Sequence, residues 1–133
     1  KMNIFSKIFG TPENQNERTS NVDWIALEDL EQLNEIITSS SEKPVLIFKH
    51  STTCGISRMV MKQFERDFDL NDKVNSYYLD LLSYRPISNE VATRFDVTHQ
   101  SPQLLLIING KSVYDVSHSA IDVAALRVQL ELR

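Results

Sequence analysis

The sequence predicts an α/β fold built on a mixed four-stranded sheet with helices on both faces. Two uninterrupted apolar runs, 45–48 and 103–108, are typical of strands buried on both sides. Asn109-Gly110 directly follows the second run and is the strongest short signal for a β-hairpin. The remaining segments repeat apolar residues at helical spacing, so we expect helices to cover the sheet.

The first half of the chain predicts a helix followed by a β-α-β unit. The helix has acidic residues near its start, ends at the serine run 39–41 and carries apolar Leu27, Leu30, Leu33, Ile36 and Ile37. After the strand at 45–48, a second helix is expected from near Cys54 to about Phe68. One side of it is expected to carry Met59, Val60, Phe64 and Phe68. A strand over 74–79 completes the unit.

The second half predicts a helix and then a β-β-α unit. Pro86 and Ser88 introduce a helix that contains Ile87, Val91, Ala92 and Phe95. The strand at 103–108 and the alternating segment 112–116 form the hairpin. An amphipathic C-terminal helix closes the chain, with apolar Ile121, Val123, Ala124, Leu126, Val128 and Leu130. Because a β-α-β half precedes a β-β-α half, the sheet contains parallel and antiparallel pairs.

The composition indicates an ordinary globular protein. The chain has 133 residues, of which 41% are apolar and 24% charged. Its net charge of −4 comes from 14 basic and 18 acidic residues without a basic block, so nucleic acid is not an expected partner. No apolar run is long enough for a membrane span. The single cysteine excludes an internal disulfide and suits a reducing cytoplasm.

Residues 1–21 are expected to form an N-terminal arm or linker, and residues 22–133 the folded domain. Met2 is expected to be the native start, with Lys1 an added residue. Residues 3–10 form a short apolar and basic stretch that is too short for a signal-peptide core. The polar segment 10–21 is typical of a linker.

Cys54 lies where a reactive thiol would be useful, between an apolar strand and the following helix. Its neighbours Ser51, Thr52, Thr53 and Gly55 favour a turn over a core position. Unpaired backbone N–H groups and the positive end of a helix dipole stabilise a thiolate, which is the nucleophile in sulfur chemistry. We therefore predict an accessible, reactive cysteine rather than an inert buried one.

Ser57 occupies the position of the second thiol in a redox Cys-X-X-Cys pair. Sulfur chemistry at Cys54 therefore has to use one thiol from this chain. Ser57 can hydrogen-bond to the sulfur, or it can be an ordinary residue of the first helical turn.

Three cationic side chains beside Cys54 have two interpretations each. Lys49 and His50 fall on opposite faces of the strand. Either can stabilise the thiolate and attract anionic groups, or simply decorate the strand end. Arg58 is expected to be a solvated charge, with an anion contact as the alternative.

The histidines form no recognisable metal or hydrolytic site. His99 is expected near the rim of the site, but a Cys-His catalytic pair would lack an identifiable third member. His118 is expected to cap or border the last helix. Together with His50 they have no metal-ligand spacing.

The order of elements, with a cysteine after the first central strand, resembles the thioredoxin fold, with room for an extra N-terminal strand. Thioredoxin-like proteins carry a cis-proline that faces the active cysteine, and Ser101-Pro102, directly before the strand at 103–108, matches that position. The resemblance implies that Ser101 presents its backbone N–H and C=O to an incoming thiol compound or peptide. A strand-entry proline is the alternative for Pro102.

A narrower resemblance covers residues 22–131. The segments 44–51 and 53–57 and the later Ser101-Pro102-Gln103 are similar to the YtxJ-like bacillithiol-system proteins, the monothiol bacilliredoxins of low-GC Gram-positive bacteria. Trp24 and the hairpin at 109–110 also fit. The family motif is Thr-Cys-Pro-Ile-Ser; Gly55 replaces its proline and relaxes the backbone beside the thiol.

The resemblance implies a cytoplasmic enzyme that removes bacillithiol, a low-molecular-weight thiol, from mixed disulfides on client proteins. Bacillithiol is then a co-substrate, and no metal or organic cofactor is implied. The thiolate attacks the mixed disulfide, frees the client and keeps bacillithiol until another thiol or a reductase clears it. The implied catalytic residue is Cys54, and the implied substrate-binding residues are Thr53, Gly55, Ser57, Ser101 and Pro102.

The residues alone do not exclude two other classes of protein. A redox-inactive thioredoxin-fold binding module would explain Gly55 and Ser57, because degenerate members lose the redox pair first. A monothiol carrier of an iron–sulfur cluster would be brown when freshly purified. Iodoacetamide labelling of the native thiol across pH separates the enzyme from the module.

Overall fold

The computed structural model describes residues 20–133. Its strands are β1 (Trp24–Ala26), β2 (Val45–His50), β3 (Asn75–Asp80), β4 (Gln103–Ile108) and β5 (Lys111–Ser117). Its helices are α3 (Glu31–Ser39), α4 (Gly55–Asp67), α5 (Arg85–Arg94) and α6 (Val123–Glu131), with a short 3₁₀ helix, η1 (His118–Ala120), before α6. The expectations for Met2, for residues 3–10 and for most of the linker fall outside the described residues. Asn21, at the end of the expected arm, is hydrogen-bonded to the backbone of α4 at Glu65 and Arg66.

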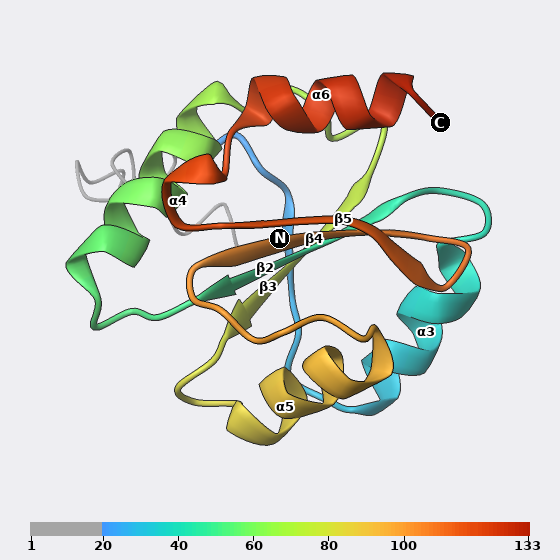
Figure 1. Cartoon of the computed structure of the whole chain (residues 1–133), viewed down its shortest axis with the longest axis horizontal. Helices are drawn as coiled ribbons and strands as arrows, with labels where there is room; N and C mark the ends of the chain where they lie inside the picture. Colours follow the sequence, from blue (N-terminus) through green and yellow to red (C-terminus); the bar gives the residue numbers. More distant parts are fainter. Residues whose placement is uncertain (1–19) are drawn as a thin grey trace, which may run out of the picture.

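The strands form one mixed sheet in the order β1-β3-β2-β4-β5 (Figure 1). β2 lies parallel to β3 and antiparallel to β4, while β1 pairs parallel with β3 and β5 antiparallel with β4. The predicted α/β fold and mixed sheet are confirmed, with β1 as the extra N-terminal strand. This strand corrects one prediction: Leu27 belongs to the loop after β1, where its N–H donates to the carbonyl of Tyr78, and the first helix begins only at Glu31.

Two helices cover each face of the sheet. α4 and α6 lie on one face and α3 and α5 on the other (Figure 1). Side chains alternate along the strands, so Leu46 and Phe48 pack under α4 and α6, while Val45 and Ile47 pack under α3 and α5. Burial on both sides explains why residues 45–48 of β2 and 104–108 of β4 are continuous apolar runs without alternation.

The buried face of α4 differs from the predicted one. Ser57, Met61 and Phe64 point into the protein, at the spacing of four and three residues that one face of a helix requires. Met59 was expected on the inner side, but its side chain is 71% exposed. At the end of the chain, the cap of α6 is Asp122, whose Oδ2 accepts from the N–H of Ala125. His118 does not cap this helix but borders it, because it opens η1 directly before α6.

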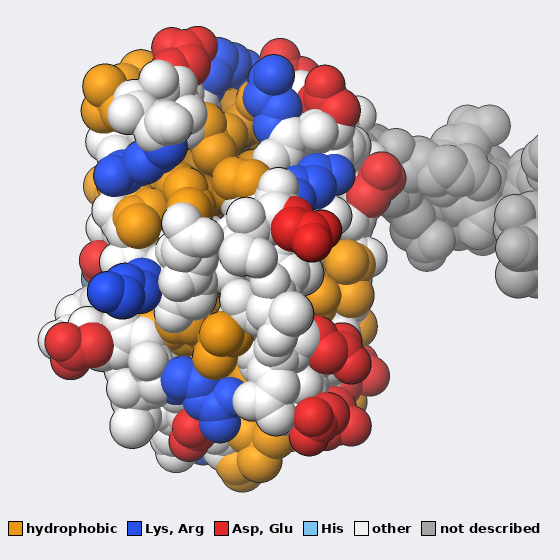
Figure 2. Space-filling model, turned by 90° about the vertical axis from the view of Figure 1, so that its right-hand side faces the viewer, with side chains coloured by type: hydrophobic (Ala, Val, Ile, Leu, Met, Phe, Trp, Pro, Cys, Tyr) orange, Lys and Arg blue, Asp and Glu red, His pale blue; other side chains and the backbone are white. Residues whose placement is uncertain are grey.

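The surface carries charges of both signs. Acidic and basic side chains lie around apolar areas on the face shown in Figure 2. None of the helices within residues 20–133 combines the length and apolarity needed to cross a bilayer.

Candidate functional site

Cys54 caps the N-terminus of α4 at the end of the turn that leaves β2. Its backbone is extended, with φ −100° and ψ 122°, and its N–H donates to the carbonyl of Ser51 at 3.2 Å. Its own carbonyl accepts the N–H of Arg58 at 3.0 Å, which closes the first helical turn. The residue is partly exposed and its thiol is free. The predicted junction of strand, polar turn, cysteine and helix is therefore present.

Ser57 is fully buried beneath this turn and is hydrogen-bonded on two sides. Its Oγ accepts the N–H of Ser51 at 3.1 Å and lies 2.8 Å from Nδ1 of His50. Burial is the main cause that lowers the pKa of His50, while the nearby carboxylates of Asp80 and Glu65 raise it. A neutral His50 accepts the Ser57 hydroxyl proton at Nδ1, so the hydroxyl serves as donor and acceptor at once.

Lys49 lies on the opposite face of β2 and is also fully buried. Its Nζ is 3.2 Å from Nδ1 of His99, and burial lowers the pKa of Lys49 to about 8. Neither Lys49 nor His50 decorates an exposed strand end, which was the alternative that the sequence allowed. Instead, Lys49 contacts the side chain of His99, and His50 contacts the side chain of Ser57.

The loop before β4 reaches the same end of the sheet. Gln103 pairs with Lys49 in the sheet register, so Ser101 and Pro102 enter the sheet beside the end of β2 that leads to Cys54. The Ser101–Pro102 peptide bond is cis; Ser101 is half-buried and Pro102 buried. The carbonyl of Pro102 accepts the N–H of His118 at 3.0 Å.

Thr53 and Gly55 flank the thiol on the exposed side of the turn. The hydroxyl of Thr53 is 3.3 Å from that of Ser51. A Cβ at Gly55 would meet only the end of the Arg58 side chain, 4.0 Å away, so open space surrounds this position. Arg58 is exposed as expected, and its guanidinium donates to the carbonyl of Thr52 at 3.1 Å.

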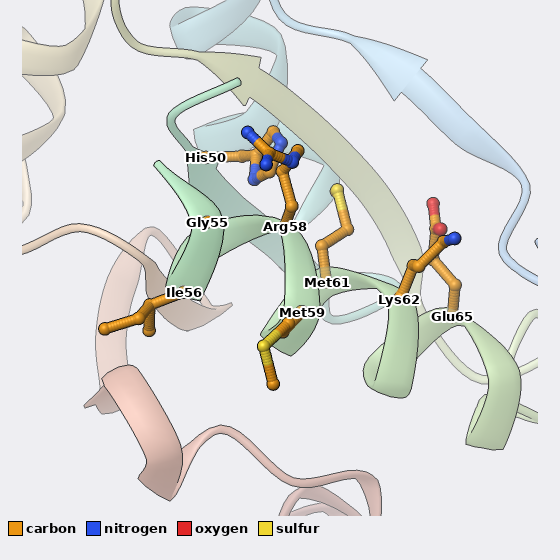
Figure 3. A pocket seen from close by; sticks show the side chains of 8 residues that line it. All are labelled: His50, Gly55, Ile56, Arg58, Met59, Met61, Lys62 and Glu65. Carbon is orange, nitrogen blue, oxygen red and sulfur yellow. The ribbon is translucent and has the colours of Figure 1, made fainter. Parts of the chain in front are cut away.

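A hollow of about 620 Å³ runs along α4 beside the cysteine. The side chains of Ile56 and Met59, exposed by 62% and 71%, extend outward from its wall (Figure 3). His50, Arg58 and Gly55, the chain neighbour of Cys54, also line the hollow (Figure 3). Sequence reasoning missed Ile56 and Met59 as surface groups. Counting the helical period from the buried Phe64 identifies Met59, five residues earlier, as outward-facing, but it does not separate Ile56, eight residues earlier, from the buried side.

Within residues 20–133 no three His, Cys, Asp or Glu side chains gather in a geometry that would hold a metal ion.

These features define a thioredoxin-fold protein with a single thiol at the active-cysteine position. Residues 25–126 match the family described as monothiol bacilliredoxin BrxC, and the chain belongs to this family. The match supports a thiol redox function.

Solved structures give the same fold. A thioredoxin-fold protein named as an oxidoreductase is 33% identical, covers 81% of this chain and 93% of its own, and has a TM-score of 0.68. A thioredoxin of Malassezia sympodialis is 23% identical over 85% of this chain and 90% of its own, with a TM-score of 0.64. Thioredoxin NaTrxh of Nicotiana alata is 20% identical over 84% and 92%, with a TM-score of 0.63. The last two show the fold alone.

Proposed function

We propose that this chain is a cytoplasmic monothiol oxidoreductase that removes bacillithiol from mixed disulfides on client proteins. The observation that carries the proposal is the partly exposed Cys54 at the start of α4, with Ser57 in place of a second thiol. Membership in the monothiol bacilliredoxin family supports bacillithiol as the proposed co-substrate.

The reaction is an exchange of one disulfide bond for another. The Cys54 thiolate attacks the bacillithiol sulfur of the mixed disulfide, the client–bacillithiol bond breaks, and the client leaves as a thiolate. Cys54 then holds bacillithiol in a new disulfide. The number of disulfides is conserved, so this step needs no metal or organic cofactor.

Ser57 cannot resolve that adduct. An aliphatic hydroxyl is a weak nucleophile at neutral pH, and this hydroxyl is bound to His50 and to the N–H of Ser51. A second bacillithiol or a reductase therefore supplies the thiolate that restores Cys54. We assign Thr53, Gly55, Ser101 and Pro102 to the surroundings of the bound thiol.

The test is incubation with oxidised bacillithiol followed by intact-mass measurement. The wild type gains one bacillithiol, which persists during purification and leaves when reduced thiol is added. Cys54→Ser gains no mass and releases no bacillithiol from a model client, whereas Ser57→Ala retains the adduct. If Cys54→Ser releases bacillithiol at the wild-type rate, the enzymatic proposal is wrong and a redox-inactive binding module stands. Brown protein would favour an iron–sulfur carrier instead.

A further inference from the structure

Two fully buried polar side chains lie next to each other where β2 ends and β4 begins. Lys49 of β2 and Gln103 of β4 are register partners, and both are 0% exposed. Partners in an antiparallel pair project to the same face, so both lie on the side that α3 and α5 cover. The other members of these two strands on this face are aliphatic.

Both side chains bind the loop that precedes Ser101 and Pro102. Gln103 donates through Nε2 to the carbonyl of Thr98 at 2.9 Å and accepts the N–H of Gln100 at 3.4 Å. Lys49 reaches the residue between them, since its Nζ lies 3.2 Å from Nδ1 of His99. Three consecutive loop residues are thus attached to two neighbouring positions in the rigid sheet.

The charge states of Lys49 and His99 indicate which of the two donates the hydrogen bond. Burial lowers the pKa of His99, and the cations of Lys49 and Arg85 lower it further, so the ring is neutral near pH 7. A neutral ring accepts at Nδ1 from the Lys49 ammonium. Among residues 20–133 no carboxylate lies within ion-pair distance of Lys49.

A buried ammonium without a counter-ion lowers the stability of the folded protein, because desolvation opposes its charged form. An unbranched apolar side chain would fill the same space without that cost. The contact with His99 is what such a replacement would lose.

We propose that Lys49 and Gln103 are positioning residues for the substrate: they hold residues 98–100 in place and thereby fix the loop that brings Ser101 and Pro102 to the bound mixed disulfide. This inference rests on the proposed function for the substrate. Whether Lys49 and Gln103 hold the loop can be measured even if the proposed function is wrong.

The first test uses Lys49→Met, with the exposed Lys111→Met as its matched control. We expect Lys49→Met to unfold at a higher temperature than the wild type, because the buried charge is gone. We also expect its KM for a bacillithiolated client to rise at least fivefold while kcat and the iodoacetamide rate of Cys54 stay within twofold. A purely structural lysine would instead give lower stability and an unchanged KM, and that result would overturn the proposal.

The second test changes the exposed partner, which the fold tolerates. His99→Gln keeps an acceptor for Lys49 and should keep the wild-type KM, whereas His99→Leu should raise KM as Lys49→Met does. Equal KM values for the two His99 variants would overturn the proposal.

Amide hydrogen exchange tests whether the loop is held in place, independently of any effect on the substrate. Exchange at residues 98–101 should be at least tenfold faster in His99→Leu and Gln103→Leu than in the wild type. Unchanged exchange would overturn the positioning role. If the wild type turns over no bacillithiolated client, the proposed function fails, and the exchange rates alone decide whether these side chains hold the loop.

Discussion

The Nδ1 atom of His50 lies 2.8 Å from the Oγ atom of Ser57, in the buried position where a second redox thiol would stand. The hydroxyl also accepts the N–H of Ser51, so one serine oxygen joins the end of β2, the cysteine turn and the first turn of α4. The missing second cysteine is thus replaced by a hydrogen-bonding group that holds the turn of Cys54.

Ser57→Ala should destabilise the protein by about 1–3 kcal/mol, because it leaves the Ser51 N–H and the His50 imidazole without a partner. Urea unfolding at pH 7 measures this difference. Ser41→Ala, which removes an exposed hydroxyl that binds only the carbonyl of Thr38, is the control and should change stability by less than about 0.5 kcal/mol. Equal losses in the two variants would show that the His50 contact is energetically neutral.

Ser57→Cys should convert the single-thiol site into one that clears its own adduct. The introduced thiol is one helical turn from Cys54 and can attack the Cys54–bacillithiol disulfide, expelling bacillithiol and forming an internal disulfide. Intact mass should show loss of the adduct and of two hydrogens without added thiol. An adduct as persistent as that of the wild type would refute this expectation.

Met59→Glu should weaken exchange with protein clients but not with small disulfides. Met59 and Ile56 form the exposed apolar wall beside Cys54, and a client surface that buries them would have to desolvate a new carboxylate. We expect KM for a bacillithiolated protein to rise roughly tenfold, as a loss of about 1.4 kcal/mol would cause. Val128→Glu, which changes an apolar residue on α6 that is 52% exposed, is the control. Parallel KM changes in both variants would rule out a local docking surface.

The stability of the wild type should rise relative to Lys49→Met as the pH increases from 8 to 10.5. The folded pKa of Lys49 is about 8 and the ordinary value is 10.5, so between them the unfolded chain binds the extra proton. The penalty of the buried amine is complete below pH 8 and disappears toward pH 10.5. Urea unfolding of both proteins at pH 7.5 and 9.5 checks this; a difference that does not change with pH would contradict it.

Gly55→Pro should stabilise the protein by about 0.4–1 kcal/mol, because proline restricts the unfolded chain. Gly55 is the first residue of α4, a position where proline is tolerated, and the extended backbone of Cys54 suits a residue before proline. Gly110 offers the contrast: its φ is +77° and a Cβ would lie 3.1 Å from Ile37. Gly110→Ala should therefore destabilise, by about 1 kcal/mol or more. Thermal unfolding compares them, and a loss of stability in Gly55→Pro would refute the first expectation.

Local patterns were sufficient to predict most of the fold. The apolar runs of β2 and β4 identify strands buried on two faces, and the strand at 103–108 has the predicted bounds. Asn109 and Gly110 both adopt positive φ in the hairpin turn, which is why that dipeptide is such a strong signal. The position of the single cysteine before a helix was also predicted locally, from the turn-forming residues beside it and the helical spacing of the apolar residues that follow.

The sequence by itself determined the α/β order, the single thiol at a helix start and the absence of a second one. Only the tertiary structure decided that His50 binds Ser57, that Lys49 binds His99, that β1 joins the sheet and that Met59 faces outward. Strand alternation predicts which face a side chain takes, but not what it meets there. Lys49 and His99 are 50 positions apart, and their contact exists because β2 and β4 pair in one register and close packing leaves the amine one polar partner.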